Sequence, residues 1–426
     1  MRKLQKRSYY GLLSTVSLSA FGDAFGLLAM EWLVYDLTGS KVAMGALALS
    51  SMIPEQVLRL LGSPLSDRLP RVRFMACLAV LRLLALLLPL GMGLAGHLQL
   101  WQLFAAASLS GACSALFLPT AMAVIPEIAG TGKLMRAFAI IDGCKGAAVL
   151  LGPALAGILT AASGALPALG VNAVCYMAAI AMLLWLPRMG KPAGPPAAAV
   201  SVSGYLREVA EGFSFYRRFP AMLTIMMMAA VSNLSSTAIW TMMVPYVREV
   251  LHRNAAAVGT LSTASALGYL TGLGVISIMG EIKQRRVVML GSLGLSGIVT
   301  MLWGFIPSYA FALFAVFAAG LMGPFFSSLS SSLHGRLVPG QLQGRVNSVR
   351  FLIGGSLSPI GALAAGTVAE LYGVPVLLIA AGLLPVLYAG VALRLPGLKA
   401  LDGDLSVLEQ RDRQRQEAVL TGNASM

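Results

Sequence analysis

The sequence predicts an all-α membrane protein with twelve transmembrane helices in two six-helix repeats. Hydrophobic residues make up 57% of the 426 residues and charged residues only 11%, and the mean hydropathy is +0.80. A soluble protein of this size could not bury so much apolar surface. Apolar runs of about 20 residues, the length that spans the hydrocarbon core of a bilayer, recur along the chain. Glycines and polar residues also recur at a constant offset, which indicates the two repeats.

The excess positive charge predicts the topology. The net charge is +14, and 25 of the 31 lysine and arginine residues fall in the two termini, the predicted inner loops and the inner ends of the adjoining spans. Three others, Lys41, Arg248 and Arg253, fall in predicted outer loops. This bias is the positive-inside rule, so we expect a multi-pass protein of the cytoplasmic (plasma) membrane with both termini cytoplasmic. The excess charge then lies against anionic lipid headgroups, and we expect no nucleic acid partner.

The apolar runs set the order of the predicted spans. The first half has spans at 10–35, 43–61, 74–96, 100–125, 138–162 and 166–186, and the second half at 221–247, 256–279, 287–306, 309–333, 349–371 and 374–395.

The longest polar interval between spans divides the chain into four predicted parts. These are an N-terminal six-helix bundle at 1–187, a cytoplasmic linker with an interfacial helix at 188–220, a C-terminal six-helix bundle at 221–395 and a cytoplasmic tail at 396–426. Within the linker, Leu206, Val209, Ala210 and Phe213 recur at helical spacing. This pattern is typical of a helix that lies at the membrane surface.

The two halves resemble each other at a nearly constant offset. Asp23 in the first predicted span corresponds to Asn233 in the seventh, 210 positions later. In the same way Gly111, Gly157 and Gly164 correspond to Gly320, Gly366 and Gly373. A parallel repeat of six helices is typical of secondary transporters, whose substrate cavity lies between the halves near the middle of the bilayer.

Ionisable residues inside the spans are the main candidates for function, because each costs about 2.5–3.5 kcal/mol at the centre of a membrane helix. Asp23 lies between Gly22 and Gly26, a spacing that allows close contact between helices. We expect Asp23 either to take up a proton or a cationic substrate, or to bind a neighbouring helix. Glu31 lies nearer the outer surface and is a weaker candidate, and Asn233 is the repeat counterpart of Asp23.

Two further sets of charges lie within spans. Glu55 and Arg59 are one helical turn apart, can pair on one face of the second span and form a charge cluster with Arg82 of the third span. Asp142 and Lys145 are spaced three residues apart in the fifth span. Each set is expected to be either a structural ion pair or part of proton coupling or substrate binding.

A short charged hinge at 62–73 joins the second and third spans. Its order of residues resembles the loop between helices two and three of the major facilitator superfamily, with Asp67, Arg68 and Arg71 at matching positions. Three neighbouring positions depart from the residues that the family prefers. The resemblance implies a gating role for Asp67, Arg68 and Arg71.

The fifth span carries a second resemblance. Gly152, Pro153 and Gly157 match the Gly-Pro-x-x-x-Gly signature of antiporters in this superfamily, although alanines replace two other glycines of the pattern. Proline bends a helix and glycine permits close packing. Many proton antiporters of the superfamily also carry a buried arginine in the fourth helix, and the span at 100–125 contains none. Proton coupling, if present, therefore uses other residues.

The sequence excludes several kinds of site. Neither of its two Gly-Lys pairs fits a phosphate-binding loop: Gly132-Lys133 is followed by leucine and has Glu127 where the loop needs glycine, and Gly190-Lys191 is followed by proline, so ATP hydrolysis by that route is excluded. The three histidines lie far apart and the four cysteines lie in apolar runs, so no metal site or disulfide is expected. We expect no cofactor and no enzymatic activity.

The first span and the loop after it resemble the drug-efflux branch of the superfamily, which includes macrolide exporters. The resembling segments are Phe21-Gly22-Asp23 and the stretch from Trp32 to Ser40. They imply a monomeric secondary transporter that exports an amphiphilic small molecule or drug by alternating access, most simply as a proton-coupled antiporter within membrane lipid. The alternatives are a siderophore exporter or a lysophospholipid transporter of the same fold.

Overall fold

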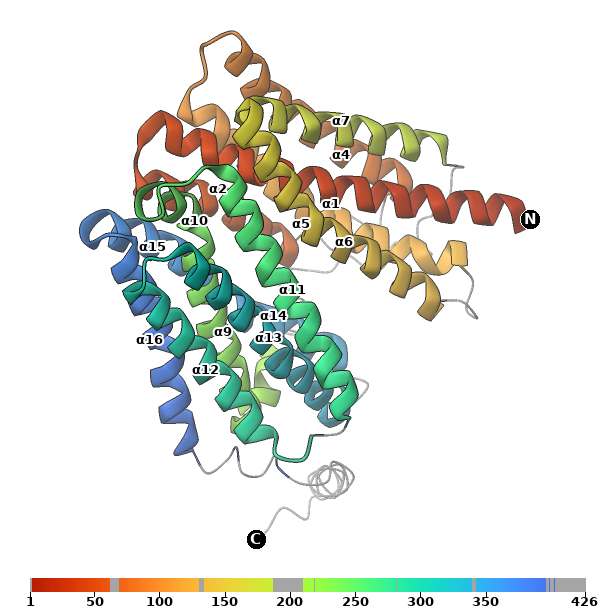
Figure 1. Ribbon diagram of the computed structural model, residues 1–426. Helices are drawn as coiled ribbons and strands as arrows, with labels where there is room; N and C mark the ends of the chain where they lie inside the picture. Colours follow the sequence, from red (N-terminus) through yellow and green to blue (C-terminus); the bar gives the residue numbers. More distant parts are fainter. Residues whose placement is uncertain are drawn as a thin grey trace. The chain divides into compact units, whose positions relative to one another are not determined.

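A computed structural model of the chain describes residues 2–61, 69–129, 134–186, 210–217, 219–280, 282–338, 342–395, 398 and 402. Every regular element in these ranges is a helix (Figure 1). The prediction of an all-α protein is therefore confirmed.

The helices follow the predicted order. The first half contains α1 (Arg2–Thr38), α2 (Lys41–Leu61), α4 (Arg71–Leu94), α5 (Leu100–Ala129), α6 (Leu134–Ser163) and α7 (Ala165–Trp185). The second half contains α9 (Pro220–Thr241), α10 (Met243–Pro245), the π-helix η2 (Tyr246–Val250), α11 (Ala255–Met279), α12 (Arg285–Phe305), α13 (Tyr309–Leu337), α14 (Gln343–Gly355), α15 (Ser358–Tyr372) and α16 (Val374–Leu393).

Eleven segments in the described part of the chain are long and apolar enough to cross a membrane. They coincide with eleven of the twelve predicted spans. The remaining predicted span is α2, which carries Lys41, Glu55 and Arg59 within its 21 residues. The class of multi-pass membrane protein is confirmed, and a count of twelve spans depends on α2.

Two predicted spans are interrupted at prolines. The seventh ends as α9 at Thr241 and continues through α10 into the π-helix η2. The eleventh is divided between α14 and α15. Pro245 and Pro359 lie at these breaks, and a proline has no backbone N–H and clashes with the carbonyl four residues earlier.

The chain forms two compact units. Unit 1 contains the described residues of Met1–Val200, Trp240–Thr263 and Ala362–Val374. In it α1 lies against α7 and α6, and α5 lies against α2 and α4. Two stretches from the predicted second bundle thus group with the first bundle, and the four predicted parts of the chain remain a prediction.

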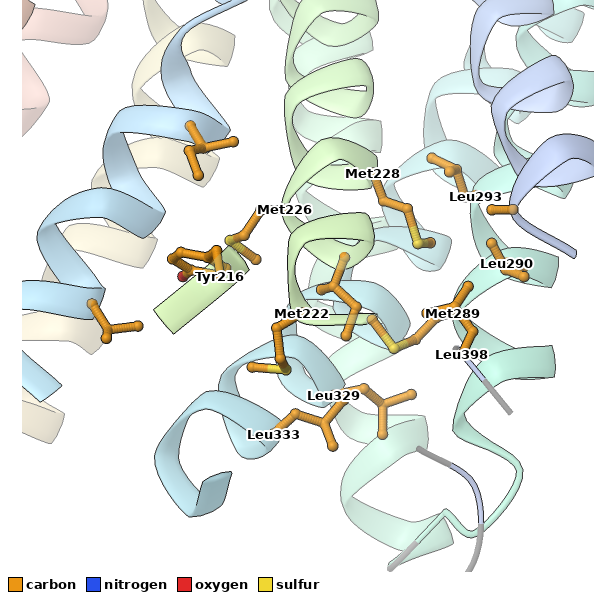
Figure 2. Packing of buried hydrophobic residues seen from close by; sticks show 14 of the residues in the cluster. Tyr216, Met222, Met226, Met228, Met289, Leu290, Leu293, Leu329, Leu333 and Leu398 are labelled. Carbon is orange, nitrogen blue, oxygen red and sulfur yellow. The ribbon is translucent and has the colours of Figure 1, made fainter. Parts of the chain in front are cut away.

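Unit 2 contains the described residues of Ser201–Ile239, Ala264–Gly361 and Pro375–Met426. Its core is rich in methionine and leucine from α9, α12 and α13 (Figure 2). Methionine fills irregular gaps between helices because its side chain is unbranched and flexible. Leu398, in the predicted tail, is also buried in this core, and the Asp402 carboxylate accepts a hydrogen bond from the Arg286 backbone N–H at 2.8 Å.

The linker helix, residues 210–217, packs into unit 2. Phe215 and Tyr216 are buried in its core, and the Tyr216 hydroxyl lies 3.1 Å from His334 Nε2. Phe213, one residue of the predicted apolar face, is exposed, and the placement of this helix at the membrane surface stays a prediction. The next two aromatic residues, Phe215 and Tyr216, are buried because their side chains reach α9 and α13. Most of the linker, including 191–203, lies outside the described residues.

Candidate functional site

A cavity of about 360 Å³ lies within unit 1. It is lined by residues of α1, α2, α4, α5 and α7, most of them apolar or small. The charged residues of the lining are Asp23, Glu31, Glu55 and Arg82. On α1, Asp23, Leu27, Met30 and Glu31 all reach the cavity. Their spacing of three, four and eight residues puts them on one face of the helix.

Asp23 forms the centre of a polar cluster in the cavity wall. Its Oδ1 atom accepts hydrogen bonds from Arg82 Nη2 of α4 and from the Tyr176 hydroxyl of α7, each at 2.5 Å. The guanidinium carbon of Arg82 lies 4.7 Å from the centroid of the Tyr176 ring, in cation–π geometry. The side chain of Arg82 is 3% exposed and that of Asp23 is 39% exposed. The acid is therefore open to the cavity while its basic partner is enclosed.

The other donors of Arg82 are also used. Its Nη1 donates to Ser19 Oγ at 3.0 Å, and its Nε lies 3.4 Å from Ser110 Oγ. A buried guanidinium needs such partners because the loss of hydration is costly. Arg82 thus joins three helices around the carboxylate of Asp23. The sequence suggested a cluster of Arg82 with Glu55 and Arg59, and the structure instead pairs Arg82 with Asp23.

The remaining acids of the cavity differ in their partners. Glu55 forms an ion pair with Arg59 one turn later on α2. Glu31 is half-buried, and among the described residues it has no hydrogen-bond or ion-pair partner.

Glycines on α1 explain how α7 approaches the cavity. A Cβ atom on Gly26 would lie 1.9 Å from Asn172 Nδ2, and one on Gly22 would lie 2.7 Å from the Cβ of Cys175. The two glycines around Asp23 therefore make room for α7. This close approach brings Tyr176, one turn after Asn172, within reach of Asp23.

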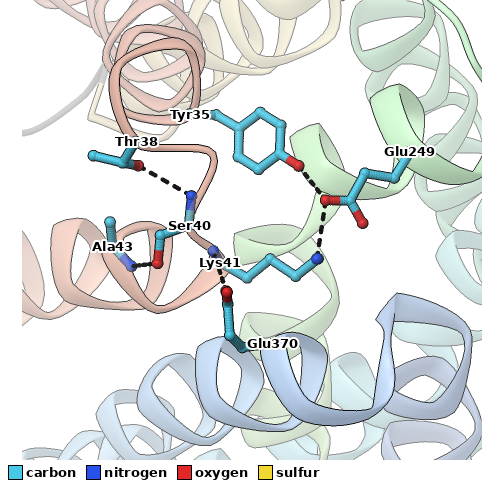
Figure 3. A network of polar contacts seen from close by, with 7 residues as sticks. All are labelled: Tyr35, Thr38, Ser40, Lys41, Ala43, Glu249 and Glu370. Carbon is cyan, nitrogen blue, oxygen red and sulfur yellow. Dashed lines mark hydrogen bonds and ion pairs between the residues drawn. The ribbon is translucent and has the colours of Figure 1, made fainter.

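A second polar cluster in unit 1 lies at the end of α1 remote from its N-terminus (Figure 3). The chain turns there at Gly39, whose φ of +59° suits glycine. Ser40 then caps α2 by accepting a hydrogen bond from the Ala43 N–H at 3.3 Å. This short turn sets the position of Lys41.

Lys41 connects two acids of the second half of the chain. Its Nζ lies 2.9 Å from Glu249 Oε1 of η2, an oxygen that also accepts a hydrogen bond from the Tyr35 hydroxyl. Its backbone N–H donates to Glu370 Oε2 of α15 at 2.7 Å. A carboxylate at this place also stabilises the free N–H groups at the start of α2. We name Tyr35, Lys41, Glu249 and Glu370 the end cluster (Figure 3).

Arg248, next to Glu249, also contacts α1. It forms an ion pair with Asp36, and its guanidinium carbon lies 5.0 Å and 5.3 Å from the centroids of the Trp32 and Tyr35 rings. Arg248 and Glu249 both belong to the π-helix η2. Single π-helical turns occur frequently at functional sites.

The antiporter-like motif of α6 forms a close helix crossing in unit 1. A Cβ atom on Gly157 would lie 2.6 Å from the Ala255 carbonyl oxygen, and one on Gly259 of α11 would lie 2.5 Å from the Pro153 carbonyl oxygen. Gly152 faces α1 instead, where a Cβ atom would lie 2.6 Å from the Cβ of Ala24. The motif therefore lets α6 approach two helices at once.

Gly366, the repeat counterpart of Gly157, also lies at a close helix crossing. A Cβ atom on Gly366 of α15 would lie 2.8 Å from the Lys41 carbonyl oxygen, and one on Gly45 of α2 would lie 2.7 Å from the Ala362 carbonyl oxygen. Gly111 and Gly320, another matched pair, both pack against a serine carbonyl, Ser51 and Ser265 respectively. At the third pair, Gly164 and Gly373 have positive φ angles of +87° and +85°, so the repeat seen in the sequence has a physical meaning at all three glycine pairs.

The other predicted candidates lie outside the cavity lining. Lys145 Nζ is 3.9 Å from Asp142 Oδ1, and the side chain of Asp142 is 68% exposed. Asn233 donates to the Gly354 carbonyl at 2.9 Å, next to the break between α14 and α15. Arg71 Nη1 donates to the Ala123 carbonyl at 3.1 Å. The other two hinge residues, Asp67 and Arg68, lie outside the described residues.

Several residues of these clusters were not candidates from the sequence. Tyr176 and Ser110 are common residues in membrane helices and carried no signal. Glu249 and Glu370 lie near predicted span ends, where a charge is ordinary. Lys41 and Arg248 did carry a signal, because they are two of only three basic residues in predicted outer loops.

Comparison with known proteins agrees with this architecture. Residues 4–420 match the family model described as "Transmembrane secretion effector". The multidrug efflux pump Tap of Mycolicibacterium fortuitum is 24% identical over 390 residues, which are 89% of this chain and 94% of that protein. Tap of Mycobacterium tuberculosis strain H37Rv is 25% identical over 416 residues, which are 94% of this chain and 96% of that protein.

Solved structures share the fold. A bacterial homologue of the human lysosomal transporter Spinster superposes with a TM-score of 0.69 at 14% identity, covering 95% of this chain and 99% of that one. The nucleoside transporter NupG gives 0.70 at 14% identity, covering 92% and 98%. The predicted resemblance to the drug-efflux branch is confirmed, and the protein is a multi-pass membrane transporter rather than an enzyme. The chain belongs to the transmembrane secretion effector family of the major facilitator superfamily.

Proposed function

We propose that this transporter exports an amphiphilic small molecule across the cytoplasmic membrane in exchange for protons, and that Asp23 is the residue that couples the two. The observation that carries the proposal is the cluster of Asp23, Arg82 and Tyr176 in the cavity wall. An acid that is open to a cavity, with its partner enclosed, can exchange a proton without exposing the partner. The efflux function of the Tap relatives supports the direction of transport.

The cavity suits a small ligand with a large apolar part. Its volume of about 360 Å³ lies near the lower end of the range of ligand sites, about 300–1,000 Å³. Leu27, Leu47 and three methionines line it. Methionine adapts to ligands of different shape, which suits the efflux of several compounds. The small volume makes an amphiphilic drug-like molecule a better fit than a siderophore or a lysophospholipid.

Proton exchange at Asp23 would change the balance of charge in the wall. When Asp23 is ionised, Arg82 is neutralised within the bundle. When Asp23 takes up a proton, Arg82 keeps its charge in an enclosed position, which costs free energy unless the surrounding helices rearrange. Protonation and helix movement are thereby linked. The sequence lacks a phosphate-binding loop, which favours an ion gradient as the source of energy.

The end cluster provides a gate for alternating access. With both termini in the cytoplasm, it lies toward the outer surface. Gly366, at one close helix crossing, is four residues from Glu370, and Ala255, which Gly157 meets at the other crossing, is six residues from Glu249. Opening outward would separate Lys41 from Glu249 and Glu370. The hinge residues Asp67, Arg68 and Arg71 would act on the cytoplasmic side. We expect the single chain to perform this cycle as a monomer in lipid.

Proton flux in liposomes tests the proposal. Purified protein is reconstituted, a pH gradient is imposed, and ethidium and Hoechst 33342 are added while a pH-sensitive dye reports the gradient. We expect each transported probe to accelerate the collapse of the gradient. Probe movement with no change in proton flux would refute proton exchange. Failure of both probes to move under any gradient would refute export of amphiphilic molecules.

A further inference from the structure

The charges that line the cavity are unequally compensated. Asp23 is neutralised by Arg82, and Glu55 pairs with Arg59. Glu31 is the remaining charged residue of the lining, and within the described ranges it has neither a donor nor a basic partner. An ionised carboxylate in an apolar cavity is stabilised by a cation, and a ligand can supply that cation.

Glu31 and Asp23 are too far apart to share one ligand charge. Both lie on the cavity face of α1 and are eight residues apart. At about 1.5 Å per residue, their Cα atoms are about 12 Å apart along the helix axis. A single ammonium group bonded to Glu31 therefore leaves Asp23 with Arg82 and Tyr176.

The surroundings of Glu31 fit an apolar body attached to that ammonium group. Met30, Met44 and Met52 line the same cavity, with Leu47 between the latter two on α2. Thioethers are soft and apolar, and they accept groups of varied shape. The cavity thus places one free carboxylate among side chains that would hold the hydrophobic part of a ligand.

We propose that Glu31 is the residue that selects substrates by charge, and that the cavity takes amphiphilic molecules with a single ammonium group. This inference rests on the proposed export function and assigns the charge of its substrate. It also assigns substrate binding and proton exchange to two different acids. Substrate binds at Glu31 while the proton exchanges at Asp23, so both can occupy the cavity wall at once.

Equilibrium binding tests the proposal without a gradient. The full-length protein in lipid nanodiscs is titrated with dansyl-hexylammonium and with its neutral N-acetyl analogue, and dansyl fluorescence gives each dissociation constant. The wild type should bind the ammonium probe more tightly. Glu31→Gln should weaken ammonium binding at least about tenfold, which corresponds to about 1.4 kcal/mol. Binding of the neutral analogue should change by less than about twofold, which also shows that the variant is folded.

Two further variants make the test specific. Glu31→Asp keeps the charge and should recover part of the preference for the ammonium probe. Glu55→Gln also removes a carboxylate from the cavity lining, but one already paired with Arg59, so its effect should be several-fold smaller than that of Glu31→Gln. Equal effects of the two glutamine variants would show that the ammonium probe responds to the overall negative charge of the cavity rather than to a bond with Glu31, and would overturn the proposal. So would an unchanged ammonium preference in Glu31→Gln, or a wild type with no preference.

The result is independent of the proposed proton exchange. If Asp23 does not couple protons, the flux assay fails and the ammonium preference at Glu31 persists. If Glu31 does not bind the cation, Glu31→Gln keeps the wild-type preference for the ammonium probe, and the flux assay still succeeds. Asp23→Asn should keep the ammonium preference while it loses gradient-driven transport. Loss of that preference in Asp23→Asn would contradict the separation of the two roles.

Discussion

The ion pair between Asp23 and Arg82 should respond unequally to the loss of each partner. Replacing Asp23 by asparagine leaves the guanidinium, 3% exposed, without a counter-charge. Breaking a buried pair in this way costs about 3–5 kcal/mol. Replacing Arg82 by methionine leaves an aspartate that is 39% exposed and still bonded to Tyr176, so the loss should be about 1–2 kcal/mol.

The double variant provides the decisive comparison. Asp23→Asn with Arg82→Met removes the uncompensated charge as well as the acid. It should recover most of the about 3–5 kcal/mol lost in Asp23→Asn alone, because a buried pair and an apolar replacement have similar stability. If the two residues did not interact, the losses of unfolding free energy in the two single variants would add in the double variant.

Equilibrium unfolding in mixed detergent micelles, followed by the fluorescence of the five tryptophans, measures these free energies. Asp142→Asn is a suitable control, because that acid is 68% exposed and its ion pair should contribute less than about 1 kcal/mol. Equal losses for Asp23→Asn and Arg82→Met would refute the reasoning. A double variant that is less stable than Asp23→Asn would refute it as well.

Three other changes test the gate, the crossing and the hinge. Glu249→Gln removes the charge that Lys41 contacts and should favour outward opening, seen as faster labelling by an impermeant reagent of a cysteine placed at Ala43, which leaves Lys41 in place; an unchanged rate would argue against a gate. Gly157→Ala would put a Cβ atom 2.6 Å from the Ala255 carbonyl oxygen and should cost about 1–3 kcal/mol of stability. The control Gly146→Ala, with no atom within 4 Å of the added Cβ, should cost little. Equal unfolding free energies of the two variants would contradict the close crossing of α6 and α11. Asp67→Asn should slow transport at normal expression, and an unchanged transport rate would count against a role for the hinge.

The fold could be predicted from the sequence because membrane helices have a strong signal in composition. Eleven predicted spans coincide with helices that meet the length and apolarity of a membrane span. The interruptions at Pro245 and Pro359 were less visible, since a proline within a membrane helix can either bend or end it. The glycine offset also had predictive value, because Gly157 and Gly366 both meet a backbone at a crossing.

The site was predicted only in part because pairing depends on which helices are neighbours. Asp23 and Glu31 stood out as charges in apolar runs, and both line the cavity. The spacing along one helix correctly paired Glu55 with Arg59, but it could not show that α4 brings Arg82 to Asp23. The role of Tyr176 depends on the approach of α7 to α1 and has no signal of its own.

The most direct test of the account is transport by Asp23→Asn under two conditions. The variant is reconstituted in liposomes and assayed with ethidium, first with an imposed pH gradient and then by exchange of labelled for unlabelled probe with no gradient. The account predicts that gradient-driven accumulation is lost while exchange continues, because asparagine cannot carry the proton. Gradient-driven accumulation at the wild-type level would contradict the claim that Asp23 couples protons to export.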